Sequence, residues 1–121
     1  MFRIYADENN PNITRWALEE GTTWDDFHTG LDQLIEQAND ASKPFSVIAT
    51  TTGRMPQGKA LSHLKRLIKI VNENDIIERF VVINNKQNPV GQAFVSMALK
   101  LFSWNDKLQI VQSEEDAQGF V

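Results

Sequence analysis

The sequence has no cysteine and no long apolar segment. The absence of cysteine from 121 residues excludes disulfides and thiolate metal sites. No apolar run approaches the roughly 20 residues that span a bilayer. The first 15 residues include Arg3, Asp7 and Glu8 instead of the unbroken apolar core of a signal peptide. We therefore expect a cytoplasmic protein without a membrane span.

Basic residues are fewer than acidic ones, and the formal net charge is −4. This balance argues against a nucleic acid as the partner, because nucleic-acid-binding domains are usually basic. Residues 43–72 nevertheless contain no acidic residue. The basic residues of this segment are Lys43, Arg54, Lys59, Lys65, Arg66 and Lys69. Such a block is either a solvated helix face or a contact surface for an anionic partner.

The hydrophobic pattern predicts strands that alternate with helices in a single domain, residues 1–121. The expected strands are Phe2–Ala6, Ile13–Leu18, Phe45–Ala49, Phe80–Ile83 and Leu108–Val111. The expected helices begin at Thr23, Lys59, Pro89 and Ser113, where Thr23 and Ser113 each have the capping-box spacing to an Asp. The order β-β-α-β-α-β-α-β-α predicts an α/β fold. Its sheet is mixed and mostly parallel, with about five strands, an N-terminal hairpin and about four helices.

The loop before the second predicted helix nearly matches a phosphate-binding loop. Gly53–Ala60 fits the pattern G-x-x-x-x-G-K-[ST] except at its last position. Ala60 lacks the hydroxyl that holds Mg²⁺, and Pro56 removes one N–H donor from the cradle. We therefore do not expect nucleotide hydrolysis, although Arg54 and Lys59 can still hold an anion there.

Three threonines end the strand that precedes this loop. Ligands of open α/β sheets bind at the carboxyl ends of strands. Thr50, Thr51 and Thr52, followed by Gly53, are therefore a candidate ligand or phosphorylation loop. The alternative is that threonine simply suits a strand end and a turn.

No combination of residues predicts catalysis or a metal site. The chain has two histidines, and it contains neither a His-Glu-x-x-His run nor a Gly-x-Ser-x-Gly elbow. His28 lies one helical turn from Asp25 and Asp32, which favours surface ion pairs. His63 lies among basic residues, which argues against a bound cation. We predict no catalytic residues, no metal and no cofactor.

The order of elements resembles the STAS domain, the fold of anti-sigma-factor antagonists, and more closely the small stand-alone STAS-like proteins of bacteria. The resemblance rests on the opening hairpin, on the strand–loop–helix of Phe45–Leu61 and on the ending Leu108–Val121. In that family the loop after the third strand carries a phosphorylated Ser or Thr, for which Thr52-Gly53 is the nearest match. The resemblance implies a non-enzymatic domain that acts by binding.

Three hypotheses for the function follow. The first is a regulatory or protein-interaction module whose contact surface is the loop and helix of residues 50–69, with Lys65, Arg66 and Lys69 at its centre. The second is a carrier of a small apolar ligand or lipid, with a pocket under the third predicted helix. The third, an enzyme, has the least support. The expected partners are another protein or a second copy, which would bind through the hairpin edge or the third predicted helix.

Overall fold

The computed structural model describes residues 2–51, 60–84, 100 and 106–121. Its strands are β1 (Phe2–Ala6), β2 (Ile13–Leu18), β3 (Phe45–Thr51), β4 (Ile77–Asn84) and β5 (Leu108–Val111). The helices of the described residues are α1 (Trp24–Asp40), α2 (Ala60–Glu73) and α4 (Glu114–Phe120). The predicted α/β class is confirmed. The helix predicted from Pro89 lies outside the described residues.

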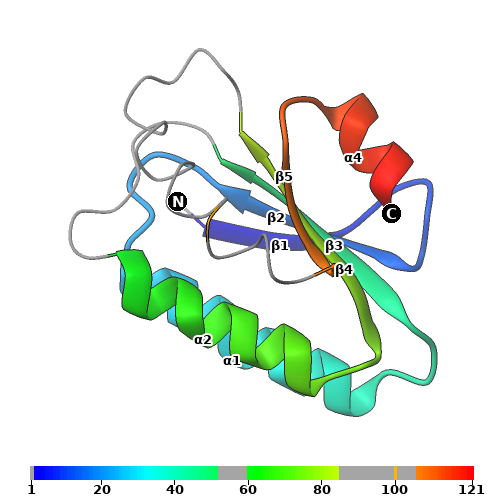
Figure 1. The fold of residues 1–121 in the computed structure, drawn as a ribbon, viewed down its shortest axis with the longest axis horizontal. Coiled ribbons are helices and arrows are strands. Elements are labelled where there is room, and N and C mark those ends of the chain that lie inside the picture. The colour runs from blue at the N-terminus through cyan, green and yellow to red at the C-terminus, as the bar shows by residue number, and fades with distance from the viewer. Residues whose placement is uncertain (1, 52–59, 85–99, 101–105) are drawn as a thin grey trace.

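The five strands form one mixed sheet in the order β1-β2-β3-β4-β5. β1 is antiparallel to β2, and the remaining neighbours are parallel. α1 and α2 cover one face of the sheet, and α4 lies on the other (Figure 1). Successive right-handed crossovers that advance in one direction along a sheet place their helices on the same face. No described helix is both long and apolar enough to cross a membrane.

The main core lies between the sheet and the α1–α2 layer. Its centre is Trp16, which is 1% exposed and makes edge-to-face contacts with Phe2, Phe27 and Phe80. The helices contribute Leu31, Leu34, Leu64, Leu67 and Val71. α1 passes close to β1 at Gly30, where a Cβ atom would lie 2.6 Å from Cζ of Phe2. Glycine at this position therefore allows the helix to approach the edge strand.

The opposite face of the sheet has a smaller apolar cluster under α4. Its buried members are Ile13, Ile48, Val81, Ile83, Val111 and Ala117. Phe120 and Val121 pack against this cluster but are only partly buried. α4 has seven residues, so it covers only part of this face.

The two helix starts predicted from the capping-box spacing are both present. Thr23 accepts a hydrogen bond from the Asp26 N–H, and the Asp26 carboxylate accepts one from the Thr23 N–H, which completes a capping box. At α4 the Ser113 hydroxyl accepts from the Asp116 N–H. The dipoles of both helices favour the carboxylates in their first turns.

Two strands, β3 and β4, were predicted too short. Thr50 and Thr51, which were expected in a loop, belong to β3 and pair with Ile83 and Asn84 of β4. β4 begins at Ile77, three residues earlier than the predicted Phe80–Ile83, because Ile77 is fully buried and pairs with β3. The polar residues between Ile77 and the apolar run concealed this part of the strand.

Candidate functional site

Two threonines of the predicted ligand loop, Thr50 and Thr51, lie on opposite faces of β3. Thr50 is partly buried and faces the α4 side, whereas the Thr51 hydroxyl donates to the Ile83 carbonyl at 3.2 Å. This second hydroxyl therefore has a partner within the sheet. Four of the other predicted site residues lie outside the described residues: Thr52, Gly53, Arg54 and Lys59.

The predicted basic surface of α2 divides into two parts. Lys65 and Lys69 are exposed and lie one helical turn apart. Arg66 is partly buried and reaches α1, where its Nη2 pairs with the Asp32 carboxylate and its Nη1 donates to His28 Nδ1 at 2.9 Å. Neither lysine forms an ion pair within the described part of the chain, whereas Arg66 joins the two helices.

The two histidines meet in the seam between α1 and α2. His28 Nε2 and His63 Nδ1 are 2.6 Å apart. Arg66 can only donate, so Nδ1 of His28 must accept. Neutral His28 therefore carries its proton on Nε2 and donates to His63 Nδ1, and His63 carries its own proton on Nε2. The expected surface ion pairs of His28 are replaced by this chain of hydrogen bonds.

The electrostatics of the seam agree with a neutral His28. Burial lowers the pKa of His28, and the nearby His63 and Arg66 lower it further, against the opposing effect of Asp25 and Asp32. Trp24 stacks on the His63 ring with centroids 4.3 Å apart. Among the described residues, no group of three or more His, Asp or Glu side chains is arranged to hold a metal ion.

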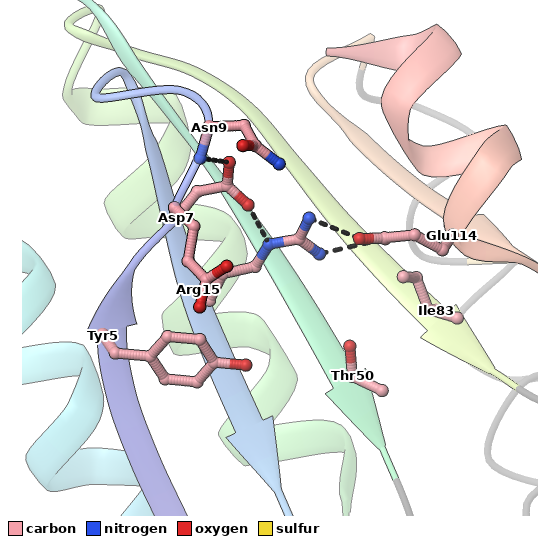
Figure 2. A pocket seen from close by; sticks show the side chains of 8 residues that line it. Tyr5, Asp7, Asn9, Arg15, Thr50, Ile83 and Glu114 are labelled. Atoms are coloured by element: carbon pink, nitrogen blue, oxygen red, sulfur yellow. Dashed lines mark hydrogen bonds and ion pairs between the residues drawn. The ribbon is translucent and has the colours of Figure 1, made fainter.

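A polar pocket of about 470 Å³ lies on the α4 face of the sheet (Figure 2). Its lining residues are Tyr5, Asp7, Glu8, Asn9, Arg15, Thr50, Ile83 and Glu114. Arg15 stands at its centre and is only 13% exposed. Three carboxylates and one guanidinium thus face the same space, with Ile83 as an apolar contribution from β4.

Arg15 connects three separate parts of the fold. Its Nε donates to Asp7 Oδ1 at 2.8 Å, and its Nη1 donates to Glu114 Oε2 at 2.9 Å. Its Nη2 pairs with the other Glu114 oxygen, which completes a two-pronged contact with the first residue of α4. The hydrogen bond that Arg15 donates to Glu114 raises the pKa of Arg15, and Asp7 adds to this effect against the opposing cost of burial.

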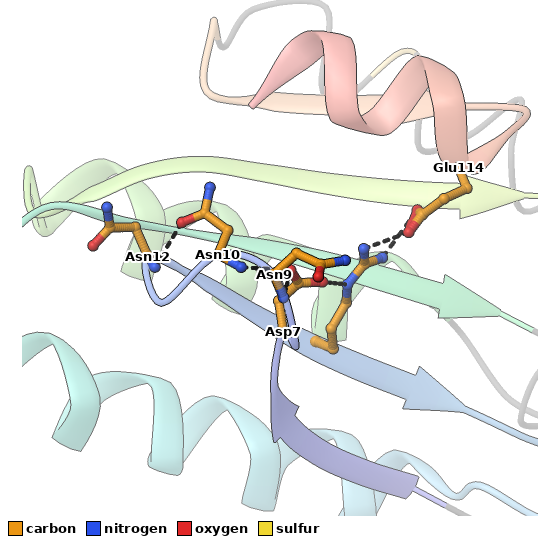
Figure 3. A network of polar contacts seen from close by, with 6 residues as sticks. Asp7, Asn9, Asn10, Asn12 and Glu114 are labelled. Carbon is orange, nitrogen blue, oxygen red and sulfur yellow. Dashed lines mark hydrogen bonds and ion pairs between the residues drawn. The ribbon is translucent and has the colours of Figure 1, made fainter.

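Asp7 also organises the turn between β1 and β2 (Figure 3). Its Oδ2 accepts from the backbone N–H groups of Asn9 and Asn10 at 3.0 and 2.9 Å. The Asn10 side chain in turn accepts from the Asn12 N–H at 2.9 Å. The hydrogen bond from Arg15 lowers the pKa of Asp7, the two backbone donors lower it further, and burial opposes them. Asp7 is therefore held as a carboxylate.

This arrangement fastens the turn and α4 to the sheet. The two carboxylates that Arg15 contacts neutralise its charge, so the guanidinium offers little attraction to an anionic ligand. Among the described residues that line the pocket, no hydroxyl is hydrogen-bonded to a side chain that could act as its base. The threonine of the predicted loop that lines it, Thr50, adds one hydroxyl.

The sequence reasoning missed Arg15, Asp7 and Glu114 as a group. The available signal was the position of Arg15 between Ile13 and Ala17, which places a charged side chain on an otherwise apolar strand face. A charge in that position needs a partner, but the alternation does not identify which one.

The chain was compared with protein-family models, with curated proteins and with solved structures. No family model, curated protein or solved structure matches this chain. The function must therefore be argued from the residues themselves.

Proposed function

We propose that the protein is a non-catalytic interaction module in which α2 binds an acidic segment of a partner protein. The observation that carries this proposal is the uncompensated charge of Lys65 and Lys69. Both are exposed, α2 has no acidic residue before Glu73, and neither lysine forms an ion pair with another described residue.

The neighbouring helix α1 restricts where on this surface an acidic segment can bind. α1 packs beside α2, and its exposed acidic residues are Asp25, Asp32, Glu36 and Asp40. An acidic segment is attracted to α2 and repelled by α1, so the pair of helices selects its position as well as its charge. Arg66 already pairs with Asp32 and is therefore not part of the contact surface.

The resemblance to STAS-like domains supports the same proposal, because domains of that kind act by binding. A protein that regulates a partner by binding its acidic segment fits this proposal. An apolar carrier has less support, because two pockets of the described residues, the one around Arg15 and another beside Lys43, are lined largely by polar and charged side chains. The pocket expected under the third predicted helix falls outside the described part of the chain.

The test is a charge reversal on α2. A Lys65→Glu/Lys69→Glu variant is compared with wild type and with Lys43→Glu, which changes an exposed lysine in the loop after α1. The probe is a fluorescent glutamate-rich peptide, titrated at low and moderate salt. We expect the double variant to bind roughly tenfold or more weakly, because exposed charge pairs contribute about 0.2–1 kcal/mol each and reversal turns attraction into repulsion.

The control variant should bind the peptide nearly as well as wild type does. Affinity capture from cell extract with the same three proteins then extends the test to natural partners. Those that depend on α2 should be lost only with the double variant. Equal binding of the peptide and of the same extract proteins by all three proteins would refute the proposal.

A further inference from the structure

The outer edge of β1 is the second surface that can bind a partner. We infer that β1 pairs antiparallel with β1 of a second copy, so that two sheets join across a two-fold axis. β1 is an edge strand, and no other described strand pairs with its outer side. Edge strands with unpaired backbone groups are templates for strand addition. This inference does not depend on the surface proposed for α2.

The hairpin register determines which backbone groups are available. The Asp7 N–H donates to the Ile13 carbonyl at 3.0 Å, so these two residues form a hydrogen-bonded pair. Such pairs alternate along an antiparallel ladder, so Tyr5 and Arg3 also direct their backbone groups toward β2. The N–H and C=O groups that point outward belong to Phe2, Ile4 and Ala6.

A two-fold axis at Ile4 satisfies all of these groups. An antiparallel second strand centred there places Ile4 opposite its own copy and Phe2 opposite Ala6. In this register every outward N–H meets an outward C=O of the other strand. A shift by one residue would set outward groups against inward ones, so the alternation excludes such shifts. A shift by two residues would leave one outward residue of each strand unpaired within β1, so the register centred on Ile4 is the one that pairs all three.

The side chains on the α4 face suit this register. It places Arg3 directly opposite Tyr5 of the second copy. Arg3, the charged residue of β1, therefore does not lie opposite Arg3 of the second copy. Within one molecule the Arg3 guanidinium already lies 5.7 Å from the Tyr5 ring centroid, so the two groups are compatible neighbours. Tyr5 is the large hydrophobic side chain that the described residues leave exposed, at 48%.

The side chains on the helix face also favour pairing. Phe2 and Ile4 pack against the main core but remain partly exposed at the sheet edge. A second strand would cover them with their own copies. β1 has no proline and no lysine, and its pairing with β2 is continuous. β1 thus lacks three of the devices that usually protect an edge strand from addition: proline, lysine and a bulge.

A five-residue strand buries little surface, so the dimer is weak. Interfaces below roughly 1,200 Å² belong to weak or transient complexes, so we expect the dimer only at high protein concentration. Backbone hydrogen bonds and apolar contacts hold the strands together, so higher salt should not weaken the dimer. Binding through the lysines of α2 should weaken with salt, and this separates the two surfaces.

The decisive variant is Ala6→Pro. The Ala6 N–H points away from β2, toward the proposed second strand. Proline at this position therefore removes a donor of the dimer without removing a hydrogen bond of the hairpin. Ala6→Ser keeps the N–H and is the matched control. Sedimentation velocity from micromolar to millimolar protein should show a reversible dimer for wild type and Ala6→Ser. For Ala6→Pro we expect a dissociation constant about tenfold or more higher, because a hydrogen bond is lost at each of two symmetric positions.

Amide hydrogen exchange locates the interface. At high protein concentration the N–H groups of Ile4 and Ala6 should gain protection, whereas those of Arg3 and Tyr5 are protected already in the monomer. A wild type that stays monomeric throughout would overturn the inference. The inference would also be overturned by a dimer that dissociates at high salt, that persists in Ala6→Pro, or in which the Ile4 and Ala6 amides gain no protection.

Discussion

The two faces of the sheet are held by different kinds of contact. The face toward α1 and α2 is a continuous apolar core built around Trp16, with amphipathic helices of 17 and 14 residues above it. The face toward α4 has a small apolar cluster and a charged network centred on Arg15. A seven-residue helix has little apolar surface, so ion pairs help to fix its position.

The comparison predicts its largest effect at Trp16. Trp16→Ala removes the ring that three aromatic side chains contact and should lower the free energy of unfolding by about 3–5 kcal/mol. Phe120→Ala, on the other face, removes a partly buried ring that lies under the Arg79 guanidinium, and should cost about 1 kcal/mol. Urea denaturation measures both values. Similar losses for the two variants would contradict the asymmetry of the faces.

An intermediate effect is expected at Arg15. Arg15→Met keeps the apolar stem but leaves Asp7 without its charged partner, and should destabilise the fold by about 1–3 kcal/mol. Arg3→Met is the matched control, because the Arg3–Glu19 pair has side chains 56% and 38% exposed. Such exposed pairs contribute about 0–1 kcal/mol. If the two arginine variants lose the same stability, Arg15 is an ordinary surface residue.

Local sequence patterns were enough for much of the fold. The bounds of β1, β2 and β5 follow from short apolar patterns, and Thr23 marks the start of α1 through its own side chain. β4 was predicted too short because Glu78 and Arg79 interrupt the apolar pattern. Arg79 is accommodated because its guanidinium lies 5.3 Å from the centre of the Phe120 ring, a contact between residues far apart in the sequence.

The candidate sites were predictable to a smaller extent. The helical periodicity of the sequence was enough to place Lys65 and Lys69 on the polar face of α2, because the spacing of apolar residues within a helix determines which face is polar. The different role of Arg66 depends on α1, and the contact of Arg15 with Glu114 joins residues 99 positions apart. Contacts at such separations depend on how the elements pack, which a single sequence does not reveal.

The smallest expected effect is the dependence of stability on pH. It distinguishes the histidines between α1 and α2 from the network of Arg15 with Asp7 and Glu114. The folded state lowers the pKa of His28 from its ordinary value of 6.5, so the unfolded chain binds this proton more readily. Stability is therefore complete above pH 6.5 and falls as the pH drops from there toward the folded pKa. The pKa of Asp7 is lowered from 3.8, so the stability that its carboxylate contributes is lost only as the pH falls below 3.8.

Chemical denaturation at pH 7.5, 5 and 3.5 distinguishes these windows. A His28→Gln/His63→Gln variant should lose less stability than wild type between the first two values, because protonating His28 places a new N–H against the Arg66 guanidinium, which is itself a donor. Asp7→Asn should follow wild type there and diverge only in the most acidic step. If Asp7→Asn instead removed the loss between the first two values, the response near neutrality would belong to the Arg15 network. The α1–α2 seam would then be insensitive to protonation.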